Sequence, residues 1–252
     1  MNFQDAIRKI EERGDFNRYA EVKPVFEEQL KQLSKGDHTE RGLCYYYLLV
    51  SYLKAQLVHE TEEAIEYYEK MEAAFLTQER EYRAKLGKFA SGEVQDFYHL
   101  MERCYNSLEF LYQHHDFKGR RDAAYQQKMR FRKDAFFFNK QWGRFLEYKF
   151  FEITCNYGSS LLRWAITTFA FTVLFATFYL LMYRNLTDSA RMIPADGHWY
   201  DYFYFSIIVT TTVGLGDIAP LTLLGKVLVS LEAFMGFMML GIFMGLVQKK
   251  FF

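Results

Sequence analysis

The feature that most constrains the fold of this chain is a run of 20 residues without a charged side chain, from Trp164 to Tyr183. Arginines stand at both of its ends, at Arg163 and Arg184. A helix rises 1.5 Å per residue, so the run spans about 30 Å, the thickness of the hydrocarbon core of a bilayer. A buried helix of a soluble protein keeps a polar stripe, whereas this run has only scattered threonines. We therefore predict a transmembrane helix.

A second apolar run extends from Leu221 to Val247. Its only charged residues are Lys226 near the start and Glu232 within it, and Lys249 follows its end. Small residues that permit close helix packing recur along it, at Gly236, Gly241 and Gly245. The sequence therefore predicts an integral membrane protein with two spans.

The formal net charge of zero conceals a partition along the chain. Residues 1–116 carry 15 basic and 22 acidic side chains, residues 117–158 carry 10 and 4, and residues 159–252 carry 6 and 5. The acidic part is typical of a soluble domain, and the basic part directly precedes the first span. The neutral total shows no electrostatic footprint for nucleic acid, so we expect no nucleic-acid partner.

The flanking charges predict the orientation, because positive residues collect on the cytoplasmic side of a membrane. The basic segment before the first span contains Arg130, Arg132, Lys133, Lys140, Arg144 and Lys149, and Lys249 and Lys250 follow the second span. The loop between the spans has no excess, with Arg184 and Arg191 against Asp188 and Asp196. We predict a multi-pass protein of the cell membrane with both termini in the cytoplasm.

The segment between the spans has the composition of a short membrane helix followed by a glycine-containing loop. His198–Thr212 is aromatic and β-branched and is long enough to go only partway through a bilayer, and Val213–Asp217 follows it. Non-helical backbone persists in a membrane only where it is buried in protein or lines a water-filled path. Alternate glycines, Gly214 and Gly216, allow successive carbonyls to point the same way, and such carbonyls around a symmetry axis can replace the water shell of a cation.

Residues Thr211–Asp217, with the sequence TTVGLGD, resemble the selectivity filter of the two-transmembrane potassium channels. The resemblance covers residues 160–250, since Pro220, Gly225 and Gly236 stand at spacings found in that family. It implies a homotetramer, because one chain supplies one filter loop and the filter needs four. It also implies K⁺ bound at Thr212, Val213, Gly214 and Leu215, with Gly216 completing the filter and Thr211, Asp217, Tyr204 and Phe205 supporting it.

Two positions depart from the common pattern of that family. Leu215 stands where most members have tyrosine, so a hydroxyl that would bond the aromatic residues around the filter is missing. Ile208 stands where several relatives have an acidic residue beside the filter aspartate, so Asp217 either has another partner, such as an indole or hydroxyl of the preceding helix, or remains hydrated. We predict a K⁺-selective channel that conducts passively; the alternative is a poorly selective cation channel.

The second span contains the candidate gating residues. Glu232 has two readings: a carboxylate behind the filter that tunes ion occupancy or gating, or a side chain bonded to Ser206 or Thr210 that ties two helices together. Gly236 lies 19 residues beyond Asp217, where such channels commonly have a hinge. Residues at helical spacing predict one face that lines the cavity and inner gate; they are Phe237, Leu240, Met244 and Gln248.

The part before the spans shows helical periodicity almost throughout, which predicts antiparallel helical hairpins. Glu62–Met71 resembles the second helix of a tetratricopeptide repeat, and Leu111–Phe117 resembles a hairpin turn of that kind. Ala64 and Ala124 are 60 residues apart, whereas strict repeats would give a multiple of 34. We predict an all-α chain with a tetratricopeptide-like cytoplasmic domain over 1–129, a juxtamembrane helix over 130–160 and a pore domain over 161–250.

The predicted role of this domain has two versions. It binds a protein or small-molecule ligand and gates the pore, or it only assembles the tetramer. The basic and aromatic juxtamembrane segment suits an interfacial helix on anionic lipid headgroups.

Several other classes of function lack a sequence signal. There is no arrangement of acid, base and nucleophile and no phosphate-binding loop, so we expect no enzymatic activity and no cofactor besides K⁺. A membrane-anchored scaffold with a vestigial pore is the alternative from a different class.

Overall fold

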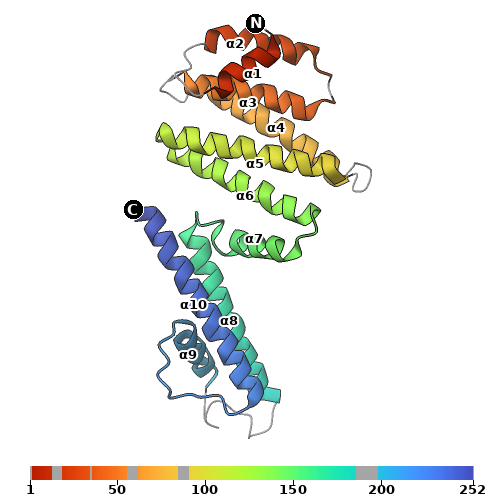
Figure 1. The fold of residues 1–252 in the computed structure, drawn as a ribbon. Coiled ribbons are helices and arrows are strands. Elements are labelled where there is room, and N and C mark those ends of the chain that lie inside the picture. Colours follow the sequence, from red (N-terminus) through yellow and green to blue (C-terminus); the bar gives the residue numbers. More distant parts are fainter. Residues whose placement is uncertain are drawn as a thin grey trace. The chain divides into compact units, whose positions relative to one another are not determined.

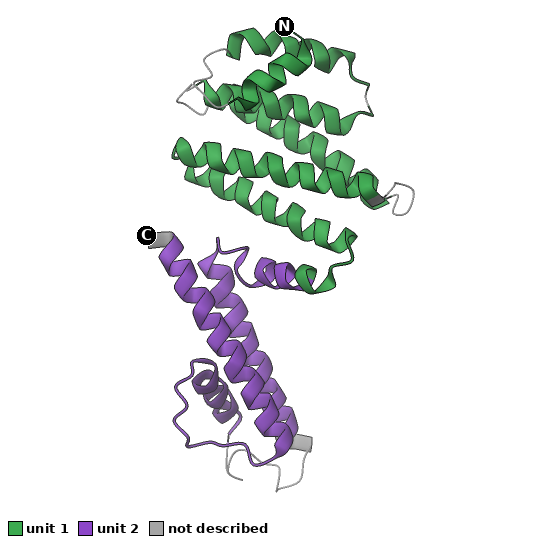
Figure 2. Cartoon of the chain, viewed as in Figure 1, with its two compact units in different colours: residues 1–145 green, residues 146–252 purple. Residues whose placement is uncertain are grey.

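The computed structural model describes residues 2–12, 19–34, 36–55, 62–84, 91–185 and 198–251. All regular structure in these residues is α-helical, which confirms the predicted fold class (Figure 1). The chain divides into two compact units, residues 1–145 and 146–252 (Figure 2). The loop charges Asp188, Arg191 and Asp196, used above to predict orientation, lie outside the described residues.

The first unit is built from helical hairpins. Its helices are α1 (Phe3–Glu11), α2 (Tyr19–Gln32), α3 (His38–Lys54), α4 (Glu62–Ala84), α5 (Ser91–His114) and α6 (Lys118–Phe138). The most extensive contacts join α3 to α4 and α5 to α6, as short connections between successive amphipathic helices require (Figure 1).

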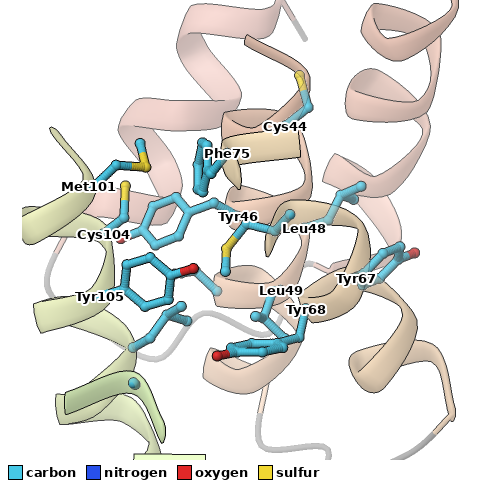
Figure 3. Close-up of a cluster of buried hydrophobic side chains, with 14 of the residues drawn as sticks. Cys44, Tyr46, Leu48, Leu49, Tyr67, Tyr68, Phe75, Met101, Cys104 and Tyr105 are labelled. Atoms are coloured by element: carbon cyan, nitrogen blue, oxygen red, sulfur yellow. The ribbon is translucent and has the colours of Figure 1, made fainter. Parts of the chain in front are cut away.

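The core of this unit is rich in aromatic residues. Tyr46 and Leu48 of α3, Tyr68 of α4 and Tyr105 of α5 belong to one buried cluster (Figure 3). Tyr105 also stacks on Phe131 of α6, with ring centroids 5.5 Å apart. Large aromatic rings therefore link helices that are distant in sequence, and each buries a large apolar area.

Ion pairs connect α6 to the acidic helices α4 and α5. Arg130 contacts the buried Glu79 at 3.0 Å, and Arg83 contacts Asp134 at 2.6 Å. Further pairs within this unit join Lys128 to Glu109 and Arg132 to Glu102. Part of the basic segment predicted to lie on lipid headgroups thus neutralises carboxylates of the same unit, a pairing that the charge count could not reveal.

The predicted juxtamembrane helix over 130–160 is two helices in the structure. The first part belongs to α6, and α7 (Trp142–Cys155) follows after a break in which Lys140 has a φ of +57°. In α7, Arg144 and Lys149 are balanced by Glu147 and Glu152. Helix α7, the helix that directly precedes the first span, therefore has no net charge.

The second unit contains α8 (Leu161–Asn185), α9 (Trp199–Thr210) and α10 (Leu223–Phe251). Leu161–Met182 and Leu223–Lys249 are long and apolar enough to cross a membrane, in agreement with the two predicted spans. The indole of Trp164 donates to the carbonyl of Met239 at 2.8 Å and packs on Phe243, so α8 and α10 are joined directly. The short helix α9 packs against both (Figure 1).

Candidate ion-conducting site

Helix α9 positions the site, and local sequence fixes both of its ends. At the start, the amide of His198 donates to the carboxylate of Asp201 at 2.6 Å, and an acidic residue in the first turn also suits the positive end of the helix dipole. At the end, the amides of Thr211 and Thr212 donate to the carbonyls of Ile207 and Val209. Helix α9 therefore ends immediately before the glycine-containing segment.

The backbone of that segment alternates in handedness. Thr212, Gly214 and Gly216 have positive φ values of +59°, +54° and +79°, whereas Val213 and Leu215 between them do not. Alternation of this kind turns successive peptide units so that their carbonyls can face one side, whereas the carbonyls of a regular strand point alternately to opposite sides. The side chains of Val213 and Leu215 are more than half exposed in the single chain.

Two amides of the segment are held by the end of α9. The N–H groups of Val213 and Gly214 both donate to the carbonyl of Ile208, at 2.9 and 3.2 Å. The carbonyl end of a helix carries a partial negative charge, and the segment begins at that end of α9. The arrangement places a favourable electrostatic environment for a cation beside Thr211 and Thr212.

Asp217 at the far end of the segment has a partner in α9. The hydroxyl of Tyr204 donates to its carboxylate at 2.7 Å. Of the possibilities left open for Asp217, an indole, a hydroxyl of the preceding helix or hydration, the structure shows the hydroxyl. Phe205, also expected to support the filter, is buried and packs edge-on against Tyr179 of α8 at 5.3 Å.

Glu232 of α10 is almost fully buried, with 1% of its surface exposed. Its carboxylate accepts hydrogen bonds from Thr210 at 3.0 Å, from Tyr179 at 2.5 Å and from Ser206. The predicted bonds to Ser206 and Thr210 are thus both present. Tyr179 was not predicted, because it lies 53 residues away and an apolar run gives no sign of which tyrosine faces inward.

Gly236 lies one turn after Glu232 and also faces the end of α9. A Cβ atom at this position would come within 2.2 Å of the carbonyl oxygen of Thr210. By contrast, a Cβ atom at Gly241 or Gly245 of the same helix would meet no atom within 4 Å. Close helix packing therefore requires glycine at 236, independently of any hinge.

The remaining candidates of α10 share one uncovered face. Phe237 and Met244 are about two-thirds exposed, and Leu240 and Gln248 are exposed as well. Their assignment to a cavity and inner gate stays a prediction.

A comparison with known proteins supports the interpretation of this region as part of an ion channel. Residues 165–252 match the model of a family described as ion channel, which covers about a third of the chain. No curated protein and no solved structure matches the chain significantly. The second unit thus contains an ion channel domain with two membrane-type helices, and an N-terminal helical region precedes it.

Proposed function

We propose that the chain forms a K⁺-selective channel that conducts passively through a tetrameric pore. The observation that carries this proposal is the alternating sign of φ over Thr212–Gly216, between two membrane-type helices and directly after a short helix. Carbonyls on one side of such a segment, repeated around an axis, replace the hydration shell of a cation without any charged side chain. The proposed K⁺ ligands are the carbonyls of Thr212, Val213, Gly214 and Leu215.

The tetramer is proposed because a single segment supplies only one wall of such a site. The exposed apolar side chains of α8 and α10 support it, since Phe169, Phe237 and Met244 are each more than 60% exposed in the single chain. In a membrane assembly, lipid would cover some of these faces and other copies of the chain the rest.

We place both termini in the cytoplasm of a cell membrane. Arg163 lies at the start of α8 and Lys249 near the end of α10, so positive residues mark the same side of both spans. Helix α7 ends six residues before α8, and its exposed Trp142, Leu146 and Ile153 suit the interface with lipid headgroups.

The N-terminal unit is proposed to assemble or gate this pore. Its tetratricopeptide-like character rests on the helical hairpins α3–α4 and α5–α6, and such surfaces bind peptides or small ligands in many proteins. The chain connection through α7 gives a covalent route for any signal from this unit to α8.

Recording from purified protein in planar bilayers tests the proposal against its two alternatives. With K⁺ on one side and Na⁺ on the other, a reversal potential that follows K⁺ supports the proposal. Reversal near zero would indicate the poorly selective channel, which Leu215 favours because its side chain has no hydroxyl to brace the filter. Protein that is inserted and tetrameric but passes no current would indicate the scaffold.

A further inference from the structure

We propose that Glu232 and Gly236 together clamp Thr210 and thereby set the conformation of the filter segment. The inference rests on the proposed function and deepens it, since it assigns positioning residues to the ion site. Glu232 holds the side chain of Thr210 through its hydroxyl at 3.0 Å. Gly236 admits the backbone of the same residue, whose carbonyl oxygen would lie 2.2 Å from any Cβ there.

The spacing explains how one helix can hold both parts of one residue. Positions 232 and 236 are four apart, so they lie on the same face of α10, one turn from each other. Thr210 is the last residue of α9, and the φ alternation starts two residues later at Thr212. A shift of α10 at this level must therefore move the first residues of the filter segment.

The carboxylate also fixes α9 to α8, which makes the clamp a three-helix junction. Tyr179 of α8 donates to one carboxylate oxygen, while Ser206 and Thr210 of α9 donate to the other. The hydroxyl oxygen of Ser206 also lies 2.9 Å from the carbonyl oxygen of Thr172 in α8. A helix of 12 residues has little stability of its own, so these contacts hold the last turn of α9 against α8 and α10.

Gly236 could act as a hinge of α10 or as part of the clamp on Thr210, and these two roles predict different results. A hinge would change how often the pore opens and leave the open filter unchanged. A clamp would change the filter itself, and so the K⁺/Na⁺ permeability ratio of the open pore. Gly241→Ala is the matched control, because it stiffens the same helix by the same substitution where a Cβ meets nothing within 4 Å.

The experiment compares permeability ratios of assembled wild type, Thr210→Val, Glu232→Leu and Gly236→Ala in bilayers. We expect each variant to lower the ratio about tenfold or more. For Thr210→Val and Glu232→Leu this corresponds to losing at least one hydrogen bond to a charged group, and Gly236→Ala acts by displacing the backbone of Thr210. Thr210→Ser and Glu232→Gln keep a hydroxyl and an acceptor oxygen, so they should retain more of the ratio. Thr177→Val removes a hydroxyl that bonds the carbonyl of Val173 within α8, and it should leave the ratio unchanged.

A second measurement does not depend on conduction. Hydrogen exchange at the amides of Thr212–Gly214 should accelerate in Thr210→Val and not in Thr177→Val, because the first three residues of the segment lose their anchor. An unchanged permeability ratio together with unchanged hydrogen exchange in Thr210→Val would overturn the clamp. So would a result in which Gly236→Ala and Gly241→Ala change the open probability equally and leave the permeability ratio unchanged. If the wild-type protein has no K⁺ selectivity, the proposed function is contradicted. The clamp is then tested by the hydrogen-exchange rates, which do not depend on conduction.

Discussion

Thr212, Gly214 and Gly216 share the left-handed backbone region, yet they tolerate it unequally. Glycine occupies that region at little cost, whereas a β-branched residue there is an outlier that costs about 1–3 kcal/mol. Thr212 therefore stays in this conformation only because its surroundings impose it. The bond from its amide to Val209 and the two bonds that Ile208 accepts provide that constraint.

Gly214→Ala tests the backbone requirement at a single residue. No heavy atom of the chain lies within 4 Å of a Cβ at this position, so within the chain the substitution acts through φ and not through a clash. A left-handed alanine costs about 1–2 kcal/mol, four times over in a tetramer, so we expect the K⁺ current to be lost while assembly persists. Single-channel recording and gel filtration measure the two outcomes.

Gly158→Ala is the control for that experiment. Gly158 has a φ of +80° and equally open space, but it lies in the turn between α7 and α8. The same backbone penalty there should leave selectivity unchanged. Equal loss of current in both variants would mean that the effect is general destabilisation and not damage to a filter.

Among the helices, the packing of α3 on α4 depends on one small residue. A Cβ at Gly42 would come within 2.3 Å of the ring of Phe75, which is fully buried. Gly42→Ala should therefore destabilise the N-terminal unit by about 1–3 kcal/mol, although alanine is the better helix former. Thermal unfolding followed by tyrosine fluorescence measures the change.

Gly119→Ala in α6 is the matched comparison, because a Cβ there meets nothing within 4 Å. Helix propensity alone should then act, and the variant should be more stable than wild type by up to about 1 kcal/mol. Destabilisation by both substitutions would contradict the packing explanation.

A polar junction between α2 and α4 predicts a pH dependence. Burial raises the pKa of the Glu63 carboxyl, but hydrogen bonds from Lys23, Tyr19 and Tyr67 outweigh it and leave this pKa below its usual value. A lowered pKa stabilises the folded state above the usual value of about 4.3, and this stabilisation is lost as the pH falls through the folded pKa.

We therefore expect Glu63→Gln to lower the melting temperature at pH 7 and to have no effect once the wild-type carboxyl is protonated. Melting curves between pH 7 and 3 measure the difference. Glu69→Gln, at an exposed position of the same helix, should follow wild type throughout. A constant difference between wild type and Glu63→Gln at every pH would show that charge at Glu63 is not involved.

Structural features that depend on consecutive residues were easier to predict from the sequence than contacts between distant residues. The two spans and the short helix α9 follow from composition over 12–27 consecutive residues, and they were predicted correctly. Contacts between distant residues were predictable only where few partners existed, as for Glu232 with Ser206 and Thr210. The pairing of Arg130 with Glu79 was not, because many carboxylates were available and only the fold of α4 against α6 selects one.

At the scale of the whole molecule, the two units have separate hydrophobic cores. Every contact described above for the filter segment lies in the second unit, including Tyr204 with Asp217 and Glu232 with Thr210. Selectivity should therefore be a property of the second unit alone, while assembly or opening can depend on the first.

Removal of residues 1–141 separates these contributions and leaves α7 intact. We expect the shortened protein to keep the wild-type K⁺/Na⁺ permeability ratio, because no bond to the filter segment is lost. Its open probability or its fraction of tetramers should change, and chemical crosslinking with recording distinguishes the two. A changed open probability with intact tetramers assigns gating to the N-terminal unit, and fewer tetramers with normal opening assign assembly. A changed permeability ratio in intact tetramers would contradict the independence of the filter, since it would require the first unit to act on Thr210–Asp217.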